Sequence, residues 1–300
     1  MAGIESGFPD FDALWDYYNP SETEARFRTL LTTLDTSQDR NYHAQFLTQL
    51  ARAQGLQRNF EQAHRTLDQA EALLTPDMAV ARARYLLERG RVFNTSGSRG
   101  DARPFFLEAL AAAQEAGAPA EADYHAVDAA HMLGIIEPPD EALEWNLKAV
   151  EMAEQSENSR ARTWLGALYN NIGWTFHNQG KYEQALDAFH KSYDAWSANG
   201  TAKDARIARW CIARTLRSLG RLPEALQAQQ QIVAEAEAAG DESGYGNEEI
   251  ALCLLALGQP EAARPYAQKA FVILSRDPWF PTDEPERLER LQKLGAQASQ

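Results

Sequence analysis

Six alanines recur along this chain at intervals of about forty residues, and each closes the same short motif. A glycine or polar residue stands five positions before the alanine, as in Gly180-Lys181-Tyr182-Glu183-Gln184-Ala185. The alanines are Ala63, Ala102, Ala142, Ala185, Ala225 and Ala263, separated by 39, 40, 43, 40 and 38 residues. Such a period is typical of chains built as arrays of one structural unit. The sequence therefore predicts six copies of that unit.

A second small residue stands twelve positions before each alanine. The set is Ala51, Gly90, Ala130, Gly173, Ala213 and Ala251. Apolar residues around both markers are spaced by three and four, which predicts helices. Two antiparallel helices approach to about 8 Å only where neither carries a bulky side chain at the crossing. Each unit is therefore expected to be a pair of antiparallel helices, and the chain an all-α solenoid.

Glycine and proline mark the expected helix ends. Gly97, Gly180, Gly220 and Gly258 suit the end of a first helix, and Pro223 and Pro260 suit the start of a second. Three more glycines, Gly117, Gly200 and Gly240, fall where a second helix should end. Pro104 and Pro265 stand two residues after the packing alanine, so their helices are expected to start late or to kink.

These positions resemble those of the tetratricopeptide repeat family. The best copy runs from Gly166 to Ala195, and its matching residues are Tyr169, Ile172, Gly173, Phe176, Tyr182, Ala185 and Phe189. The resemblance covers roughly Ala44 to Arg276, with a period near forty that is similar to the kinesin-light-chain type. It implies an α-solenoid wound as a right-handed superhelix, in which the first helix of each unit lines a concave groove.

The ends of the chain are expected to be helical caps, because terminal repeats would otherwise expose an apolar face. We expect one elongated domain over 1–300, with caps at 1–43 and 277–300 around six repeats at 44–276. A short aromatic helix is expected around Phe8 to Tyr18, then a helix from Ser21 to about Leu34. The last helix is expected from Asp283 to about Leu294.

Composition and motifs exclude several function classes. Forty-three acidic residues against 29 basic ones give a net charge of −14, which disfavours nucleic-acid binding. Cys211 and Cys253 are too few for a disulfide framework or a cysteine zinc site, and we expect both to be buried. No motif for catalysis, a metal or a cofactor is present, so we expect no enzyme. Lacking a leader or a long apolar run, the sequence predicts a cytoplasmic protein without membrane contact.

The groove positions that the resemblance implies are more basic than the rest of the chain. Five of thirty are arginine, while one is acidic. The candidate binding residues are Arg52, Arg84, Arg91, Asn94, His131, Asn170, Trp174, His177, Trp210, Arg214 and Arg217. Guanidinium groups bind carboxylates through two parallel hydrogen bonds, asparagine can pair with a peptide backbone, and tryptophan can anchor a partner.

The leading hypothesis is a protein-interaction scaffold or adaptor. Its groove would bind a protein or peptide with acidic residues or a C-terminal carboxylate. The alternative for the site is that the arginines pair with neighbouring acids and the tryptophans fill space. The alternative for the function is a peptide-sensing regulatory module that controls a transcription or signalling partner. The sequence leaves the partner and the oligomeric state open.

The N-terminal segment has two possible roles of its own. It carries Asp10, Asp12 and Asp16 among aromatic residues. One role is a cap packed on the first repeat. The other is an internal ligand that occupies the basic groove until a partner displaces it.

Overall fold

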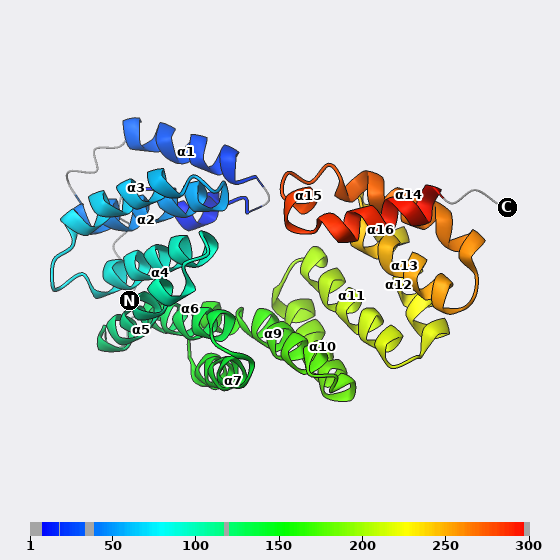
Figure 1. Cartoon of the computed structure of the whole chain (residues 1–300). Helices are drawn as coiled ribbons and strands as arrows, with labels where there is room; N and C mark the ends of the chain where they lie inside the picture. The colour runs from blue at the N-terminus through cyan, green and yellow to red at the C-terminus, as the bar shows by residue number, and fades with distance from the viewer. Residues whose placement is uncertain (1–7, 18, 34–38, 117–119, 297–300) are drawn as a thin grey trace. The chain divides into compact units, whose positions relative to one another are not determined.

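The computed structural model describes residues 8–17, 19–33, 39–116 and 120–296. Over these ranges the chain consists of helices joined by turns, without a strand (Figure 1). It forms two compact units, Met1–Trp164 and Leu165–Gln300. The expected all-α solenoid of helix pairs is confirmed, whereas one continuous domain over 1–300 stays a prediction.

Unit 1 holds the N-terminal cap and three helix pairs. Its elements are η1 (Phe11–Leu14), α1 (Pro20–Thr33), α2 (Arg40–Leu56), α3 (Phe60–Leu73), α4 (Ala79–Thr95), α5 (Arg99–Glu115), α6 (Ala120–Ile136), α7 (Pro139–Gln155) and the single turn α8 (Ser159–Arg162). The pairs are α2 with α3, α4 with α5 and α6 with α7, and α1 packs on α2.

Unit 2 repeats the arrangement with its own C-terminal cap. Its elements are α9 (Leu165–Asn178), α10 (Tyr182–Asn199), α11 (Ala202–Ser218), α12 (Leu222–Ala238), α13 (Gly244–Ala256), α14 (Pro260–Leu274), α15 (Phe280–Asp283) and α16 (Pro285–Ala296). Each odd-numbered helix from α9 to α13 pairs with its successor, and α16 covers α14.

The recurring small residues lie where the paired helices cross. All six small residues of the first helices, and all six alanines of the second, are buried. Gly90 shows how close the helices come, because a Cβ added there would stand 2.5 Å from Cε1 of Phe106. A Cβ at Gly173 would stand at the same 2.5 Å from Cε1 of Phe189. The expected close crossing is therefore present, with a ring of the second helix filling the space of the missing methyl.

Replacing Gly90 by alanine is expected to lower the free energy of unfolding by about 1–3 kcal/mol, because the methyl group would overpack the crossing. The matched control is Gly100→Ala on α5, where an added Cβ meets nothing within 4 Å. That control should change stability by about 0–1 kcal/mol in the favourable direction, since alanine is the better helix former. Thermal unfolding followed by circular dichroism measures both changes, and equal effects would contradict the crossing argument.

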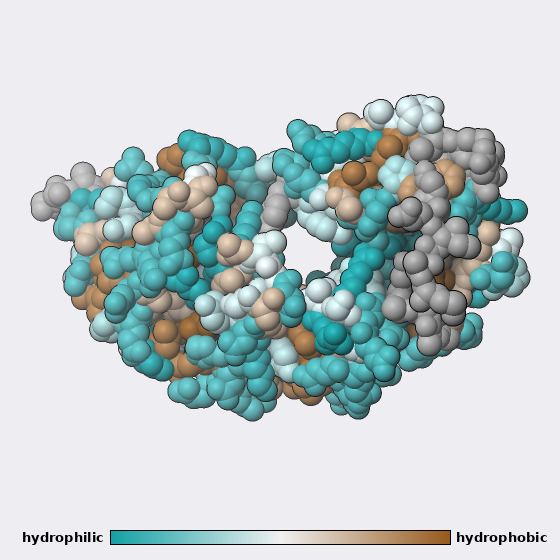
Figure 2. Space-filling model, turned by 180° about the vertical axis from the view of Figure 1, so that it is seen from behind, coloured by the Kyte–Doolittle hydropathy of each residue, from teal (hydrophilic) through white to brown (hydrophobic). Residues whose placement is uncertain are grey.

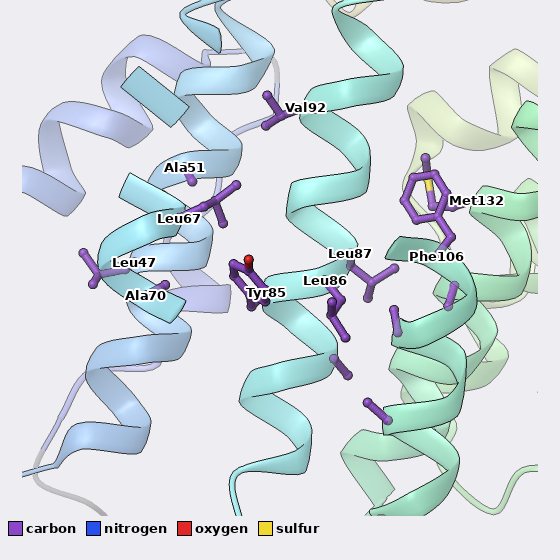
Figure 3. Packing of buried hydrophobic residues seen from close by; sticks show 14 of the residues in the cluster. Leu47, Ala51, Leu67, Ala70, Tyr85, Leu86, Leu87, Val92, Phe106 and Met132 are labelled. Carbon is purple, nitrogen blue, oxygen red and sulfur yellow. The ribbon is translucent and has the colours of Figure 1, made fainter. Parts of the chain in front are cut away.

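The core runs between successive helix pairs. Figure 3 shows Leu67 of the first pair beside Tyr85 of α4, while Leu86 and Leu87 lie on the opposite side of α4, toward Phe106 of α5. Within each unit the second helices also pack on the first helix of the next repeat, as α5 does on α6 and α10 on α11. In unit 1 the first helices α2, α4 and α6 pack on one another as well. On the face that Figure 2 shows, apolar residues lie in small patches between hydrophilic ones.

The turns follow the expected chemistry with one exception. Gly97, Gly180, Gly220, Gly240 and Gly258 have positive φ, and α14 begins at Pro260. Gly117 lies outside the described residues. Pro104 and Pro265 lie inside α5 and α14, which begin five residues earlier, so the expected late start is wrong. A proline removes one backbone N–H bond, and burial of the alanine two residues before it holds the first turn in place.

Candidate functional site

The eleven candidate binding residues all lie on first helices. They are Arg52 on α2; Arg84, Arg91 and Asn94 on α4; His131 on α6; Asn170, Trp174 and His177 on α9; and Trp210, Arg214 and Arg217 on α11. Within unit 1, α4 contacts α2 and α6, and within unit 2, α11 contacts α13. In each unit, the face of the first helices that carries these candidate residues is called the first-helix surface.

Two candidate arginines of unit 1 bridge neighbouring repeats. Arg52 Nη1 donates to Glu88 Oε1 at 2.9 Å, and Arg91 Nη1 donates to the same oxygen at 2.6 Å. Arg91 Nη2 also donates to Asp128 on α6. The Glu88 and Asp128 side chains are 4% and 6% exposed, so both acids are buried between repeats. Burial opposes ionisation of Asp128, but Arg91 and Arg52 hold the pKa of its carboxyl below the ordinary value.

Two candidate arginines of unit 2 share one fully buried acid. Arg214 Nη1 donates to Glu249 Oε1 at 2.5 Å, and Arg217 Nε donates to Glu249 Oε2 at 2.7 Å. The Glu249 side chain is 0% exposed. The Arg214 guanidinium also lies 5.5 Å from the ring centre of Trp174 and 5.6 Å from that of Trp210. The bridge and the tryptophans therefore form one packed cluster.

The three repeat-to-repeat bridges follow one positional rule. Their arginines directly follow the small residue of their own first helix: Arg52, Arg91 and Arg214. Their acids stand two residues before the small residue of the next first helix: Glu88, Asp128 and Glu249. We call this pattern the bridge rule. Pairing with neighbouring acids, the alternative that the sequence left open, therefore describes these three arginines and Arg217.

Arg84 differs, because its carboxylate partner comes from the N-terminal segment rather than from a repeat. Arg84 Nη1 donates to Asp12 Oδ1 at 3.1 Å and Nη2 to Oδ2 at 2.5 Å. Arg160 of α8 donates to Asp12 Oδ2 at 2.7 Å. The Arg84 side chain is 5% exposed and that of Asp12 is 18% exposed. An acidic side chain from outside the repeats is thus held on the first-helix surface of unit 1.

His125 fixes the orientation of Arg84. Arg84 Nε donates to His125 Nε2 at 3.1 Å. Burial and the Arg84 charge together lower the pKa of His125 to about 3, so the ring is neutral and can accept this bond. Burial would raise the pKa of Asp12, but Arg84 and Arg160 bring it down to about 2. The site is therefore built to hold an ionised carboxylate.

The remaining polar candidates have mixed surroundings. Burial lowers the pKa of His131 to about 4, and its ring lies 4.9 Å from that of Trp164. Asn170 Oδ1 accepts from Cys211 Sγ at 3.3 Å, and His177 Nε2 lies 3.0 Å from Ser218 Oγ. Asn94 is partly exposed near the end of α4.

An aromatic row crosses the first-helix surface of unit 2. Ring centres lie 6.0 Å apart for Trp174 and Trp210, 6.1 Å for Trp210 and Tyr245, and 5.9 Å for Tyr245 and Phe280. The Arg287 guanidinium lies 5.2 Å from the ring centre of Tyr245. The row joins α9, α11, α13 and α15 through ring contacts.

A pocket of about 650 Å³ lies beside this row, between α11, the end of α12 and the start of α13. It exists because α13 begins at Gly244, seven residues before its small residue, whereas α11 begins eleven residues before its own. The missing turn leaves Ile207 41% and Tyr245 46% exposed around the opening. The volume is in the range of ligand and side-chain pockets.

Other chemistry is limited in the described residues. No three histidine, cysteine or acidic side chains there come together as a metal site. Cys211 and Cys253 are buried, and burial raises the pKa of their thiols to about 12 and about 11. No helix in the described ranges is both long and apolar enough to cross a membrane.

Comparisons with known proteins bear on the repeats. A tetratricopeptide repeat family model matches residues 165–196. The structure is similar to that of a STAND protein with a tetratricopeptide repeat sensor from Pyrococcus horikoshii, at TM-score 0.64 and 16% identity over 93% of this chain and 44% of that one. The chain is built of tetratricopeptide-like repeats. It spans less than half the length of that protein.

Two further structures share these tetratricopeptide-like repeats. One is a chain of kinesin-light-chain-like repeats from Podosopora anserina, at TM-score 0.50 and 16% identity over 66% of this chain and 96% of that one. The other is the apo form of the quorum sensor NprR from B. thuringiensis, at TM-score 0.60 and 17% identity over 94% and 78%. The resemblance to long-period repeats is therefore confirmed. No curated protein sequence matches the chain.

Sequence reasoning missed the acids of these tetratricopeptide-like repeats. Glu88, Asp128 and Glu249 fall outside the thirty groove positions that the resemblance implies, because they face the preceding repeat. Their common place, two residues before the small residue, was a usable signal. Arg160 of α8 lies outside the repeat pattern, so periodicity could not point to its bond with Asp12.

Proposed function

We propose that the chain is a non-catalytic interaction scaffold or adaptor that binds a peptide or an acidic protein segment on its first-helix surfaces. The observation that carries this proposal is the Asp12 carboxylate bound by Arg84 and Arg160 in unit 1. That contact supports the surface as one that can hold a peptide carboxylate with two guanidinium groups. Such charge-assisted bonds are among the strongest in peptide recognition.

The first-helix surface of unit 2 offers a different kind of contact. The aromatic row and the pocket beside Ile207 provide apolar area, which dominates the energy of most protein interfaces. We leave out the four arginines bonded to buried acids and His131, whose pKa burial lowers to about 4. The proposed ligand contacts are Arg84, Asn94, Asn170, Trp174, His177 and Trp210. His131 and the four bridging arginines stabilise the repeats around them.

The proposed class of partner and the proposed cellular location rest on composition. The net charge of −14 disfavours nucleic acid as the partner and favours a protein segment that meets local basic groups. Two free, buried cysteines fit a reducing compartment, which supports the proposed cytoplasmic location.

Photo-crosslinking tests this function. A photoreactive phenylalanine derivative at Ile207, beside the pocket, should capture discrete protein partners in native lysate. Capture should weaken at high salt, because screening weakens exposed charge pairs. The matched control position is Leu147 on the second helix α7, which is 51% exposed against 41% for Ile207. Equal capture of the same partners at Leu147, or none at Ile207, would contradict the proposal.

A peptide-sensing regulatory module is the second candidate. It is favoured by two of the similar structures, whose names describe a tetratricopeptide repeat sensor and a quorum sensor. Mass spectrometry of the species captured at Ile207 separates the two candidates. A transcription factor or a kinase among the captured partners would favour the regulatory module, and an unrelated assembly would favour the adaptor.

A further inference from the structure

The N-terminal segment occupies the first-helix surface of unit 1 with one aromatic residue and one acid in succession. The ring centre of Phe11 lies 5.1 Å from the Arg84 guanidinium, while Asp12 takes both outer nitrogens of the same group. The Arg84 guanidinium thus contacts two adjacent side chains. Its planar face lies against the Phe11 ring, and the nitrogens at its edge bind the Asp12 carboxylate.

Neighbouring side chains orient both Arg84 and Arg160 toward the bound Phe11-Asp12 pair. His125 fixes Arg84 through Nε, and the Arg160 guanidinium lies 4.3 Å from the ring centre of Tyr124. These contacts come from α6 and α8, so they belong to the body of the unit and remain when the segment leaves. The space left beside Asp12 is only about 30 Å³, so the segment fills its site.

The charge of the site favours an acidic occupant. The guanidinium groups of Arg52, Arg84 and Arg160 line this site, and among the described residues the repeats line it with the carboxylates of Glu88 and Asp128, which Arg52 and Arg91 bind. Without Asp12, the almost fully buried Arg84 would keep no carboxylate partner among the residues that the structure describes, which is costly for a buried charge. Any replacement for the segment must therefore bring an anion.

We infer that the Arg84–Arg160 site is a receptor for an aromatic residue followed by aspartate, that Phe11-Asp12 is its resident ligand, and that a partner carrying the same pair competes for it. The inference rests on the proposed function, because it assumes that the first-helix surface takes acidic segments. It adds the recognised motif and an internal competitor that sets the threshold for partner binding.

Competition is measured with the full chain and a fluorescein-labelled peptide that has the sequence of residues 8–17. The variant Asp12→Asn weakens the resident ligand, so it should bind the peptide about tenfold tighter or more than the unaltered chain does. The matched control is Asp10→Asn, which removes a charge from the same segment. Asp10 caps η1 by accepting from Asp12 N at 2.9 Å. The control should bind as the unaltered chain does.

A second measurement uses the unaltered chain. Excess unlabelled peptide should increase hydrogen exchange in peptic fragments that extend from the segment into α1, which differ in mass from the added peptide. Equal peptide affinity of the Asp12→Asn and unaltered chains, together with unchanged exchange, would overturn the inference and leave the segment a cap. Because the probe is a defined peptide, this outcome is separate from the crosslinking result at Ile207.

Discussion

Replacing Glu249 by alanine is expected to lower the free energy of unfolding of unit 2 by about 3–5 kcal/mol, the cost of breaking a buried ion pair. The carboxylate is 0% exposed and holds Arg214 and Arg217 together. Its removal would leave Arg214 between the tryptophan rings without its acid. Urea unfolding followed by tryptophan fluorescence measures the loss, since Trp174 and Trp210 surround that guanidinium.

The matched control for this prediction is Glu224→Ala. Glu224 also pairs with an arginine, Arg221, but the two side chains are 57% and 45% exposed. Solvent screens exposed ion pairs, so they contribute little to stability, and the control should be nearly neutral. A loss of similar size in both variants would show that burial does not set the value of the Glu249 bridge.

Acidification from pH 6.5 to pH 4.5 is expected to lower the free energy of unfolding of unit 1 by about 2–3 kcal/mol for each of two histidines. The pKa values in the folded chain are about 3 for His125 and about 4 for His131. The unfolded chain therefore takes up protons first as the pH falls through about 6.5, and stability falls with it. The pKa of Asp12, about 2, lies below this window.

The variant His125→Gln tests the assignment, because glutamine keeps an acceptor for Arg84 Nε without titrating. Denaturation at a series of pH values gives the slope of the free energy of unfolding against pH. Between pH 6.5 and pH 4.5, this slope should correspond to about one proton fewer in His125→Gln than in the unaltered chain. His64→Gln, at a partly buried ring whose pKa burial also lowers, should change the slope less. An unchanged slope in His125→Gln would contradict a neutral His125 in the folded chain.

The fold was readable from the sequence because its strongest constraint is local and periodic. A small residue is needed at every helix crossing, as the contact of Gly90 with Phe106 shows, so the requirement recurs with each repeat. The turn glycines are equally local, since their positive φ favours glycine. The proline inside α5 was misjudged because buried contacts of the same turn outweigh its backbone effect.

The candidate site was readable only in part. The arginines were found by their position on the first helices, but their roles depend on partners in the next repeat. Arg91 and Asp128 are 37 residues apart, so pairing requires the stacking geometry as well as the helix face. Asp12 and Arg160 are 148 residues apart and lie outside the periodic pattern. Periodicity carries no information on such a contact.

The bridge rule also bears on how arrays of this kind could lengthen. Glu88 and Arg91 give the α4–α5 repeat both halves of a bridge, an acid toward the preceding repeat and an arginine toward the following one. A tandem duplication of that repeat would place the arginine of one copy against the acid of the other. The other described bridging repeats carry one half each, so α4–α5 is the module best suited to concatenation, and gene duplication or design would gain a matched junction by copying it.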